Sequence, residues 1–115
     1  MIVTIEGIWT VDAYGAFGWE NHGFLVLEKG RVIGGNNSIY YWGTYRVSGD
    51  NLESDWIVRH FGQPRTFFGE PKEEIKLKVT GSLKNGEIHA VLRRPDRPEY
   101  ELQCRFTRHM DLPTV

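Results

Sequence analysis

The feature that most constrains this chain is an alternation of apolar and polar side chains with a period of two, which continues along nearly the whole sequence. Only β-strands place successive side chains on opposite faces, and no stretch has the i, i+3, i+4, i+7 spacing of an amphipathic helix. The predicted strands cover residues 2–11, 18–28, 31–35, 39–48, 51–60, 73–84, 87–94 and 99–109. The sequence therefore predicts an all-β chain of eight strands.

Three short turns, Lys29-Gly30, Gly49-Asp50 and Asn85-Gly86, predict how their flanking strands pair, because a two-residue loop fixes which residues face each other. The predicted cross-strand pairs include Val26 with Ile33, Leu27 with Val32, Tyr41 with Val58, Val47 with Leu52, Val79 with Leu92 and Leu83 with Ile88. Gly43 is predicted to face Trp56, which suits a strongly curved sheet because the missing side chain leaves room for the large ring.

The 115 residues are enough for one domain and too few for two, since chains divide only beyond roughly 250 residues. Short strands joined by tight turns, without helical crossovers, favour an up-and-down antiparallel meander. Closing the meander removes its exposed edges, so we expect an eight-stranded antiparallel barrel over residues 1–115. Residues 61–72 are too long for a tight hairpin and form the best candidate for a loop or lid.

Composition limits the partners. Lys and Arg total 14 against 15 Asp and Glu, so the net charge of −1 lacks the basic excess of a protein held on phosphate backbones, and we expect no direct nucleic-acid partner. The single cysteine, Cys104, excludes an internal disulfide and fits a reducing compartment. The chain has neither a signal-peptide pattern nor a membrane-spanning apolar run, so we expect a cytoplasmic protein.

No catalytic or metal-binding constellation is evident in the sequence. The four histidines have no metal-ligand spacing, and no nucleophile-elbow or phosphate-loop motif occurs. Asp50, Glu53 and Asp55 form the nearest approach to a carboxylate cluster, but alternation places Glu53 and Asp55 on the outer face, where water keeps them ionised. We therefore expect a protein without enzymatic activity, cofactor or metal.

Six aromatic side chains are predicted to point into the barrel. They are Trp9, Tyr41, Tyr45, Trp56, Tyr100 and Phe106. Such rings either fill the interior or line a pocket for a small apolar ligand, in which case Trp9, Tyr45, Trp56 and Phe106 would bind it. Because side chains alone can occupy a barrel of eight strands, a packed core is favoured over a pocket.

The outer face carries an unexpected group of apolar residues. The predicted registers place them on neighbouring strands, pointing away from the barrel: Phe24, Val26, Ile33, Tyr40, Trp42 and Ile57. A contiguous apolar patch marks an interface or a surface that another segment covers. Either the patch pairs with its copy in a two-fold dimer, or residues 61–72, with Phe61, Phe67 and Phe68, fold over it; we favour the dimer.

The order of these motifs resembles the GrlR-like family, named after a negative regulator of type III secretion in enteropathogenic bacteria. The resemblance covers roughly the first 60 residues. It rests on Glu6-Gly7-Ile8-Trp9, the hairpin of residues 23–30, Gly34-Gly35-Asn36 and Tyr41-Trp42-Gly43-Thr44-Tyr45. It implies a calycin-like eight-stranded barrel, a homodimer, and sequestration of a transcriptional activator by protein–protein contact.

In that family an exposed acidic tetrapeptide after the matching strand is associated with partner binding. Here the loop reads Ser48-Gly49-Asp50-Asn51 and is followed by Leu52-Glu53-Ser54-Asp55, so the run of carboxylates is interrupted and only Asp50 lies in the matching stretch. We therefore take the loop with Asp50, Glu53 and Asp55 as the candidate partner-binding loop, in which the resemblance itself extends only to Asp50. The leading hypothesis is a dimeric protein-binding module, and the alternative is a lipocalin-like carrier of a small apolar ligand.

Overall fold

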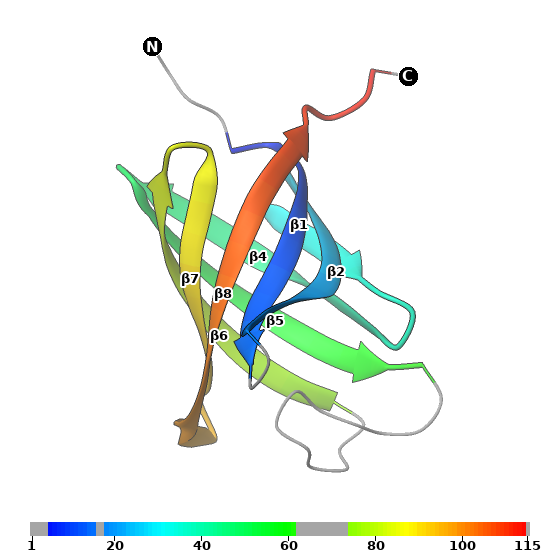
Figure 1. The fold of residues 1–115 in the computed structure, drawn as a ribbon, viewed down its shortest axis with the longest axis vertical. Helices are drawn as coiled ribbons and strands as arrows, with labels where there is room; N and C mark the ends of the chain where they lie inside the picture. Colours follow the sequence, from blue (N-terminus) through cyan, green and yellow to red (C-terminus); the bar gives the residue numbers. More distant parts are fainter. Residues whose placement is uncertain (1–4, 16–17, 62–73, 115) are drawn as a thin grey trace.

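The eight strands close into a single antiparallel barrel in which every strand pairs with its neighbours along the chain and β1 pairs with β8 (Figure 1). The computed structural model describes residues 5–15, 18–61 and 74–114. The strands are β1 (Gly7–Gly15), β2 (Gly18–Glu28), β3 (Arg31–Gly35), β4 (Ile39–Ser48), β5 (Asn51–His60), β6 (Glu74–Lys84), β7 (Glu87–Arg94) and β8 (Arg97–Met110). The predicted fold class is confirmed.

The turns set the registers that the sequence predicts. Lys29 and Asn85 have positive φ angles of 50° and 49°, and each is followed by a glycine with positive φ, as a type I′ turn requires. All the predicted cross-strand pairs around the three turns are present, including Gly43 opposite Trp56. A β-carbon on Gly43 would lie 1.8 Å from the carbonyl oxygen of Asp55, so the backbones approach too closely for any side chain there.

Strands β1 and β8 differ most from prediction. β1 begins at Gly7 and continues to Gly15, and β8 begins at Arg97, directly after a two-residue turn that pairs Arg94 with Arg97. The ladder register shifts at that turn. Tyr100 is half-buried and is not among the side chains of the hydrophobic core. Its ring lies beside the guanidinium groups of Arg94, which is fully buried, and of Arg97.

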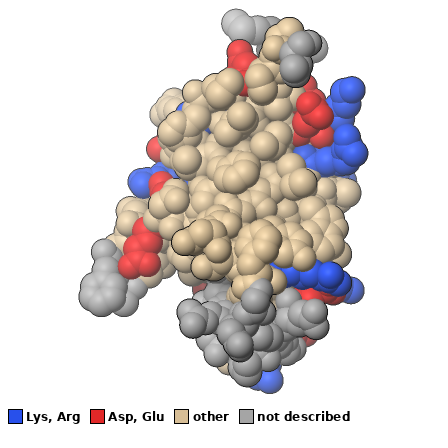
Figure 2. Space-filling view, turned by 90° about the vertical axis from the view of Figure 1, so that its right-hand side faces the viewer, with Lys and Arg blue, Asp and Glu red and all other residues tan. Residues whose placement is uncertain are grey.

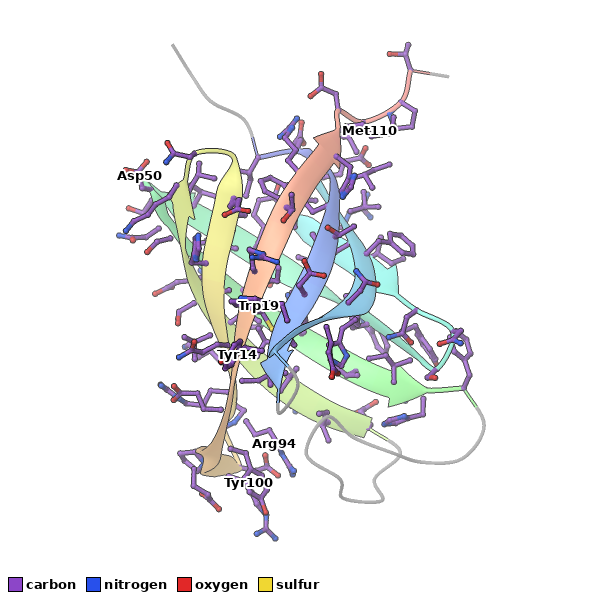
Figure 3. The ribbon with its side chains drawn as sticks, in the orientation of Figure 1. Tyr14, Trp19, Asp50, Arg94, Tyr100 and Met110 are labelled. Atoms are coloured by element: carbon purple, nitrogen blue, oxygen red, sulfur yellow. The ribbon has the colours of Figure 1, made fainter. Side chains whose placement is uncertain are left out.

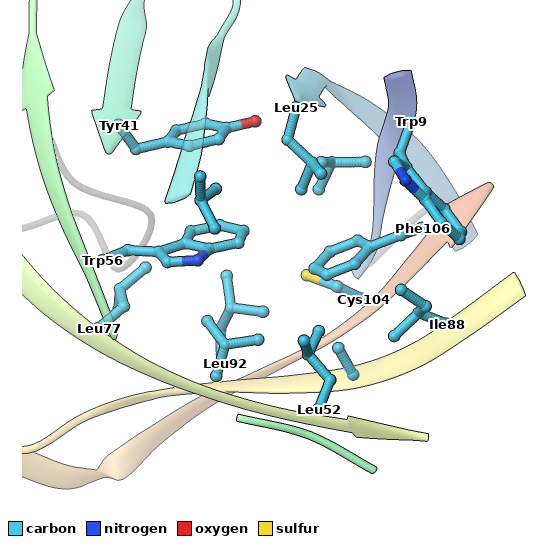
Figure 4. Close-up of a cluster of buried hydrophobic side chains, with 14 of the residues drawn as sticks. Trp9, Leu25, Tyr41, Leu52, Trp56, Leu77, Ile88, Leu92, Cys104 and Phe106 are labelled. Carbon is cyan, nitrogen blue, oxygen red and sulfur yellow. The ribbon is translucent and has the colours of Figure 1, made fainter. Parts of the chain in front are cut away.

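The core is built from stacked rings with satisfied polar atoms (Figure 4). The Trp56 ring lies between Tyr41 and Phe106, with centroid separations of 4.9 and 5.9 Å. The Trp56 indole N–H donates to the hydroxyl of Ser54 at 2.7 Å, and that hydroxyl donates to a backbone carbonyl. The Trp9 indole N–H donates to the carbonyl of Ile5 at 3.0 Å. These contacts favour the packed interior over an open pocket.

Candidate functional site

The unusual surface of this barrel is an apolar region that spans the outer face of β2, β3, β4 and β5. The cross-strand pairs place Val26, Ile33, Trp42 and Ile57 in one continuous row. The parallel row beside it runs from Phe24 through a glycine to Tyr40. We call these six side chains together with Phe61 the outer apolar face. Figure 2 shows a broad expanse without charged side chains, bordered by charges of both signs.

The predicted outward direction is confirmed for the three most exposed of these side chains. Ile33 is 62% exposed, Phe24 48% and Trp42 37%, whereas the others on β2, β4 and β5 are half-buried. Most large apolar residues of a folded domain avoid water, and a contiguous group of exposed ones indicates a contact surface. The geometry therefore identifies this region as the strongest candidate for a functional surface.

Three rings form a ladder across this face. Tyr40 stacks on Trp42 with centroids 5.9 Å apart and an interplanar angle of 17°, and Phe61 packs on Tyr40 at 4.8 Å. Phe61 is 57% exposed, and its backbone N–H donates to the carbonyl of Ser38 at 2.9 Å. Phe61, predicted as part of a covering lid, thus extends the exposed apolar surface. The other two aromatic residues of that predicted lid, Phe67 and Phe68, lie outside the described residues.

Shallow hollows flank the central tryptophan. One holds about 530 Å³ between Phe24, Tyr40, Phe61 and Trp42. Two others, of about 450 and 500 Å³, lie toward Glu28 and toward Ile57, and Trp42 lines all three. Trp42 therefore separates the three hollows. A substitution at Trp42 would change all three of them, and with them most of the outer apolar face.

The border of the face carries both signs of charge. The Arg59 guanidinium bonds the Glu74 carboxylate at 2.8 Å and lies 5.8 Å from the centre of the Trp42 ring. The hydrogen bond with Glu74 is the main reason that the pKa of Arg59 is raised. On the opposite border, Glu28 pairs with Arg31 across β2 and β3. A rim with both signs can face its own copy without net repulsion.

The four residues predicted to bind an interior ligand are placed in or against the core. Trp9, Trp56 and Phe106 are at most 2% exposed, and Tyr45 is half-buried against them. Burial raises the pKa of the nearby Cys104 thiol to about 12, with a smaller contribution from the charge of Asp12. Trp56 stacks on Phe106, and the buried side chains form one hydrophobic cluster, so the structure offers little support for a carrier.

The three carboxylates assigned to partner binding do not form an acidic patch. Arg46 lies between Glu53 and Asp55, with nitrogen–oxygen distances of 3.4 and 3.6 Å, and compensates both charges. Asp50 lies at the tip of the β4–β5 hairpin, where its carbonyl accepts a hydrogen bond from the backbone of Leu83 (Figure 3). Only Asp50 presents its carboxylate at the hairpin tip.

Sequence reasoning missed two local clusters (Figure 3). At the end of the β1–β2 hairpin, exposed Tyr14 packs edge-on against Trp19, and the Arg105 guanidinium lies 4.6 Å from the Trp19 ring centre. The uncharged, aromatic-rich stretch of residues 13–19 was the available signal. At the β7–β8 turn, fully buried Arg94 forms a two-point ion pair with Asp96, which alternation alone cannot predict.

Chemistry-bearing groups are otherwise scattered. Over residues 5–15, 18–61 and 74–114, no three His, Cys, Asp or Glu side chains gather closely enough to hold a metal ion. Within the same described ranges, no helix is long and apolar enough to cross a membrane. Comparison of the sequence with protein-family models and with curated proteins finds no match. The resemblance to the GrlR-like family therefore stays a prediction.

Proposed function

We propose that this chain is a non-enzymatic, cytoplasmic binding module that forms a homodimer through its outer apolar face and acts by contact with another protein. The resemblance of the N-terminal half to the GrlR-like family suggests a transcriptional activator as that protein. The observation that carries the proposal is the exposure of Phe24, Ile33 and Trp42 on adjacent strands of a barrel whose core is already full.

The size of the face supports a second copy as its occupant. A fully exposed aromatic side chain presents about 150–250 Å², so the exposed fractions of Phe24, Ile33, Trp42 and Phe61 leave roughly 400 Å² of apolar surface in water. A standard interface hides about 800 Å² on each partner, of which somewhat more than half is apolar. The outer apolar face thus supplies nearly the apolar area that one subunit of a stable dimer needs.

The charge distribution supports a protein partner over nucleic acid. The net charge is −1, and the borders of the face alternate in sign, as between Arg59 and Glu74. A phosphate backbone is bound by a continuous basic surface, which this face does not present. Protein interfaces, by contrast, place apolar and aromatic side chains at the centre and polar groups at the rim.

Two tryptophans of similar exposure provide the test. Trp42 is 37% exposed at the centre of the face, and Trp19 is 41% exposed on the β1–β2 hairpin outside it. We expect the wild type and Trp19→Lys to sediment as dimers at micromolar concentration and Trp42→Lys to sediment as a folded monomer. A monomeric wild type, or equal dissociation by both substitutions, would reject the dimer through this face.

A further inference from the structure

Strand β2 extends past its neighbour β3. Residues 24–28 of β2 pair with β3, whereas residues 18–21 pair with β1 on one side and with no described residue on the other. Successive residues of a strand direct their N–H and C=O groups to opposite sides, so this segment presents main-chain donors and acceptors along a free edge. We call residues 18–21 the open β2 edge.

Two local features end the pairing of β2 with β3. Gly23 has a φ of 115°, a β-carbon on it would lie 2.1 Å from the carbonyl oxygen of Gly35, and the β1–β2 register shifts at the same level. A register shift of this kind bends a strand. After β3, the Asn36 amide donates to the carbonyl of His22 and accepts a hydrogen bond from the backbone of Ile39, which turns the chain toward β4. Strand β3 therefore stops before it reaches the open β2 edge.

The open β2 edge is accessible in the folded chain. Trp19, Glu20 and Asn21 are all exposed, Trp19 by 41%. Tyr14, opposite Trp19 on β1, is 55% exposed and packs edge-on against it (Figure 3). A strand added here would therefore lie directly beside the Trp19 ring, which Tyr14 supports from the other side. None of these residues belongs to the outer apolar face.

Strand β8 also has a free edge, but that edge is less suited to pairing. Its residues 97–103 pair with β7, and no described residue of β1 pairs with them. Pro98 lacks the N–H group that an added strand would need, and proline on an edge strand prevents pairing. The open β2 edge contains no proline, so all four of its residues carry an N–H group.

The uncompensated charge beside the open β2 edge is negative. Asp12 is bound to Arg105 at 3.4 Å, whereas none of the described residues forms an ion pair with Glu20. Alternation places Glu20 and Trp19 on opposite faces. Cross-strand pairs of opposite charge, and of an aromatic with a β-branched side chain, stabilise a sheet. The edge therefore suits a segment with a basic residue opposite Glu20 and an aliphatic residue opposite Trp19.

A second copy of this chain fits the same edge poorly. Pairing of two β2 edges about a two-fold axis at Glu20 would set the two carboxylates opposite each other, and like charges in that position are destabilising. An axis at Trp19 would set Gly18 opposite Glu20, so the charge would stay unpaired. A different protein with Lys or Arg at this position replaces repulsion with attraction.

We propose that the open β2 edge is where the partner protein binds, by adding an extended segment as a further strand with Lys or Arg opposite Glu20 and an aliphatic side chain opposite Trp19. In this mode main-chain hydrogen bonds supply affinity and alternate side chains supply specificity. The inference rests on the part of the proposed function in which the chain acts by contact with another protein. It does not depend on the dimer, because the open β2 edge and the outer apolar face share no residue.

The probe is the pentapeptide Lys-Val-Lys-Val-Lys with blocked termini, titrated to millimolar concentration into ¹⁵N-labelled protein. Its palindromic pattern sets a lysine opposite Glu20 and a valine opposite Trp19 in either strand direction. We expect saturable amide shifts and peptide NOEs at residues 18–21, with a dissociation constant on the order of 10⁻³ M. The acidic peptide Glu-Val-Glu-Val-Glu, and the basic peptide with its three central residues N-methylated, should each bind at least fivefold more weakly.

Charge reversal locates the contact. Glu20→Lys should reverse the preference, so that the acidic peptide binds at least fivefold more tightly than the basic one. Glu53→Lys makes the same change of charge on the β4–β5 hairpin and should leave the wild-type preference in place. Trp19→Ala should weaken binding of the basic peptide at least threefold, and Trp42→Ala should change it less than twofold.

Several results would overturn the proposal. The basic peptide could give no saturable shift, or its shifts could fall on residues 97–103 or on the outer apolar face. Glu20→Lys and Glu53→Lys could alter the peptide preference alike, or N-methylation could leave the affinity unchanged. Shifts at residues 18–21 that grow with protein concentration in the absence of peptide would assign the edge to a second copy instead.

Sedimentation of the same samples separates this proposal from the dimer. Peptide binding at residues 18–21 of a monomeric wild type would support the open β2 edge and reject the dimer. A dimeric wild type without any peptide response would reject the open β2 edge and leave the dimer standing.

Discussion

The two sides of the barrel have opposite outer surfaces around the same core. On β2–β5 the outward positions hold the outer apolar face, whereas on β6–β8 they hold charged and polar side chains, such as Arg93 paired with Glu101 at 2.6 Å. Inward positions are apolar on both sides except for Ser54 on β5 and Arg94 on β7. Because both sides belong to one closed barrel, the inward pattern is what specifies the fold. The outward apolar residues of β2–β5 are not needed for that pattern, and the proposed contact with a partner would explain them.

The largest expected difference between the core and the outer apolar face is in the free energy of unfolding after substitution of two neighbouring tryptophans. Trp56 is 2% exposed and stacked between rings, whereas Trp42 lies outside. Trp56→Ala should lower the free energy of unfolding by about 3–5 kcal/mol, because it leaves a cavity in the core. Trp42→Ala should cost the monomer clearly less, because more than a third of Trp42 is already in water and its loss opens no cavity in the core.

Urea denaturation of both variants at a protein concentration that keeps them monomeric makes this measurement. Trp19→Ala serves as the control for loss of an exposed indole. If Trp42→Ala destabilised the monomer as much as Trp56→Ala, the outer apolar face would be part of the folding core and its exposure would need no partner.

Strand order and register could be predicted because both depend on local signals. The two-residue turns fix which residues pair, and alternation fixes which face each side chain takes. The start of β8 could not be predicted in this way. The predicted strands end at residue 94 and resume at residue 99, whereas Arg94 and Arg97 pair around a tight turn at residues 95–96. Buried Arg94 also forms an ion pair with Asp96 within this turn, a contact that alternation cannot predict.

The outward direction of the side chains in the candidate site could be predicted, but not all of its residues could. The registers alone place Ile33 and Trp42 outward on neighbouring strands. Phe61 could not be assigned to the face, because its position depends on a hydrogen bond from its backbone to the loop residue Ser38. The pairing of β3 with β4 could not be predicted from a turn, because the loop of residues 36–38 contains no two-residue turn motif.

A second comparison uses matched aliphatic residues on the two sides. Ile57 on β5 and Val91 on β7 are both half-buried and outward-facing, one on the outer apolar face and the other on the charged side. Ile57→Lys should weaken self-association by about 2 kcal/mol, or roughly 30-fold, because it buries an unpaired charge in the interface. Val91→Lys should leave the dimer unchanged. Sedimentation equilibrium distinguishes these outcomes, and equal effects would locate the contact elsewhere.

Alkaline pH should lower the stability of the fold, first through Cys104 on the charged side of the core and then through Tyr41 beneath the outer apolar face. Burial raises the pKa of Cys104 on β8 to about 12, whereas an unfolded thiol titrates near 8.5. Above about pH 8.5 the unfolded chain loses a proton that the folded chain keeps, so stability is complete below that pH and falls as pH rises toward 12. The slope should approach about 1.4 kcal/mol per pH unit.

Denaturation at intervals from pH 8 to 10 tests this dependence, with Cys104→Ala expected to have a shallower slope over the same range. Above about pH 10 the wild type should steepen further, because burial also raises the pKa of Tyr41 beneath the outer apolar face. Identical slopes for the wild type and Cys104→Ala would show that the thiol is accessible to water in the folded barrel.

Salt should have the smallest effect, and it should act in opposite directions on the ion pairs of the charged side and on the contact through the outer apolar face. The ion pairs of the charged side, such as Arg93 with Glu101, are about half exposed, and such pairs contribute only about 0–1 kcal/mol. Raising NaCl from about 0.1 to 1 M shortens the screening length from roughly 10 to 3 Å and should lower monomer stability by less than about 1 kcal/mol. An interface centred on Trp42 and Ile33 is apolar, so the dimer should hold or tighten under the same change. A tenfold weakening of the dimer in high salt would instead assign self-association to the charged rim, with Arg59 and Glu74 as the first pair to substitute.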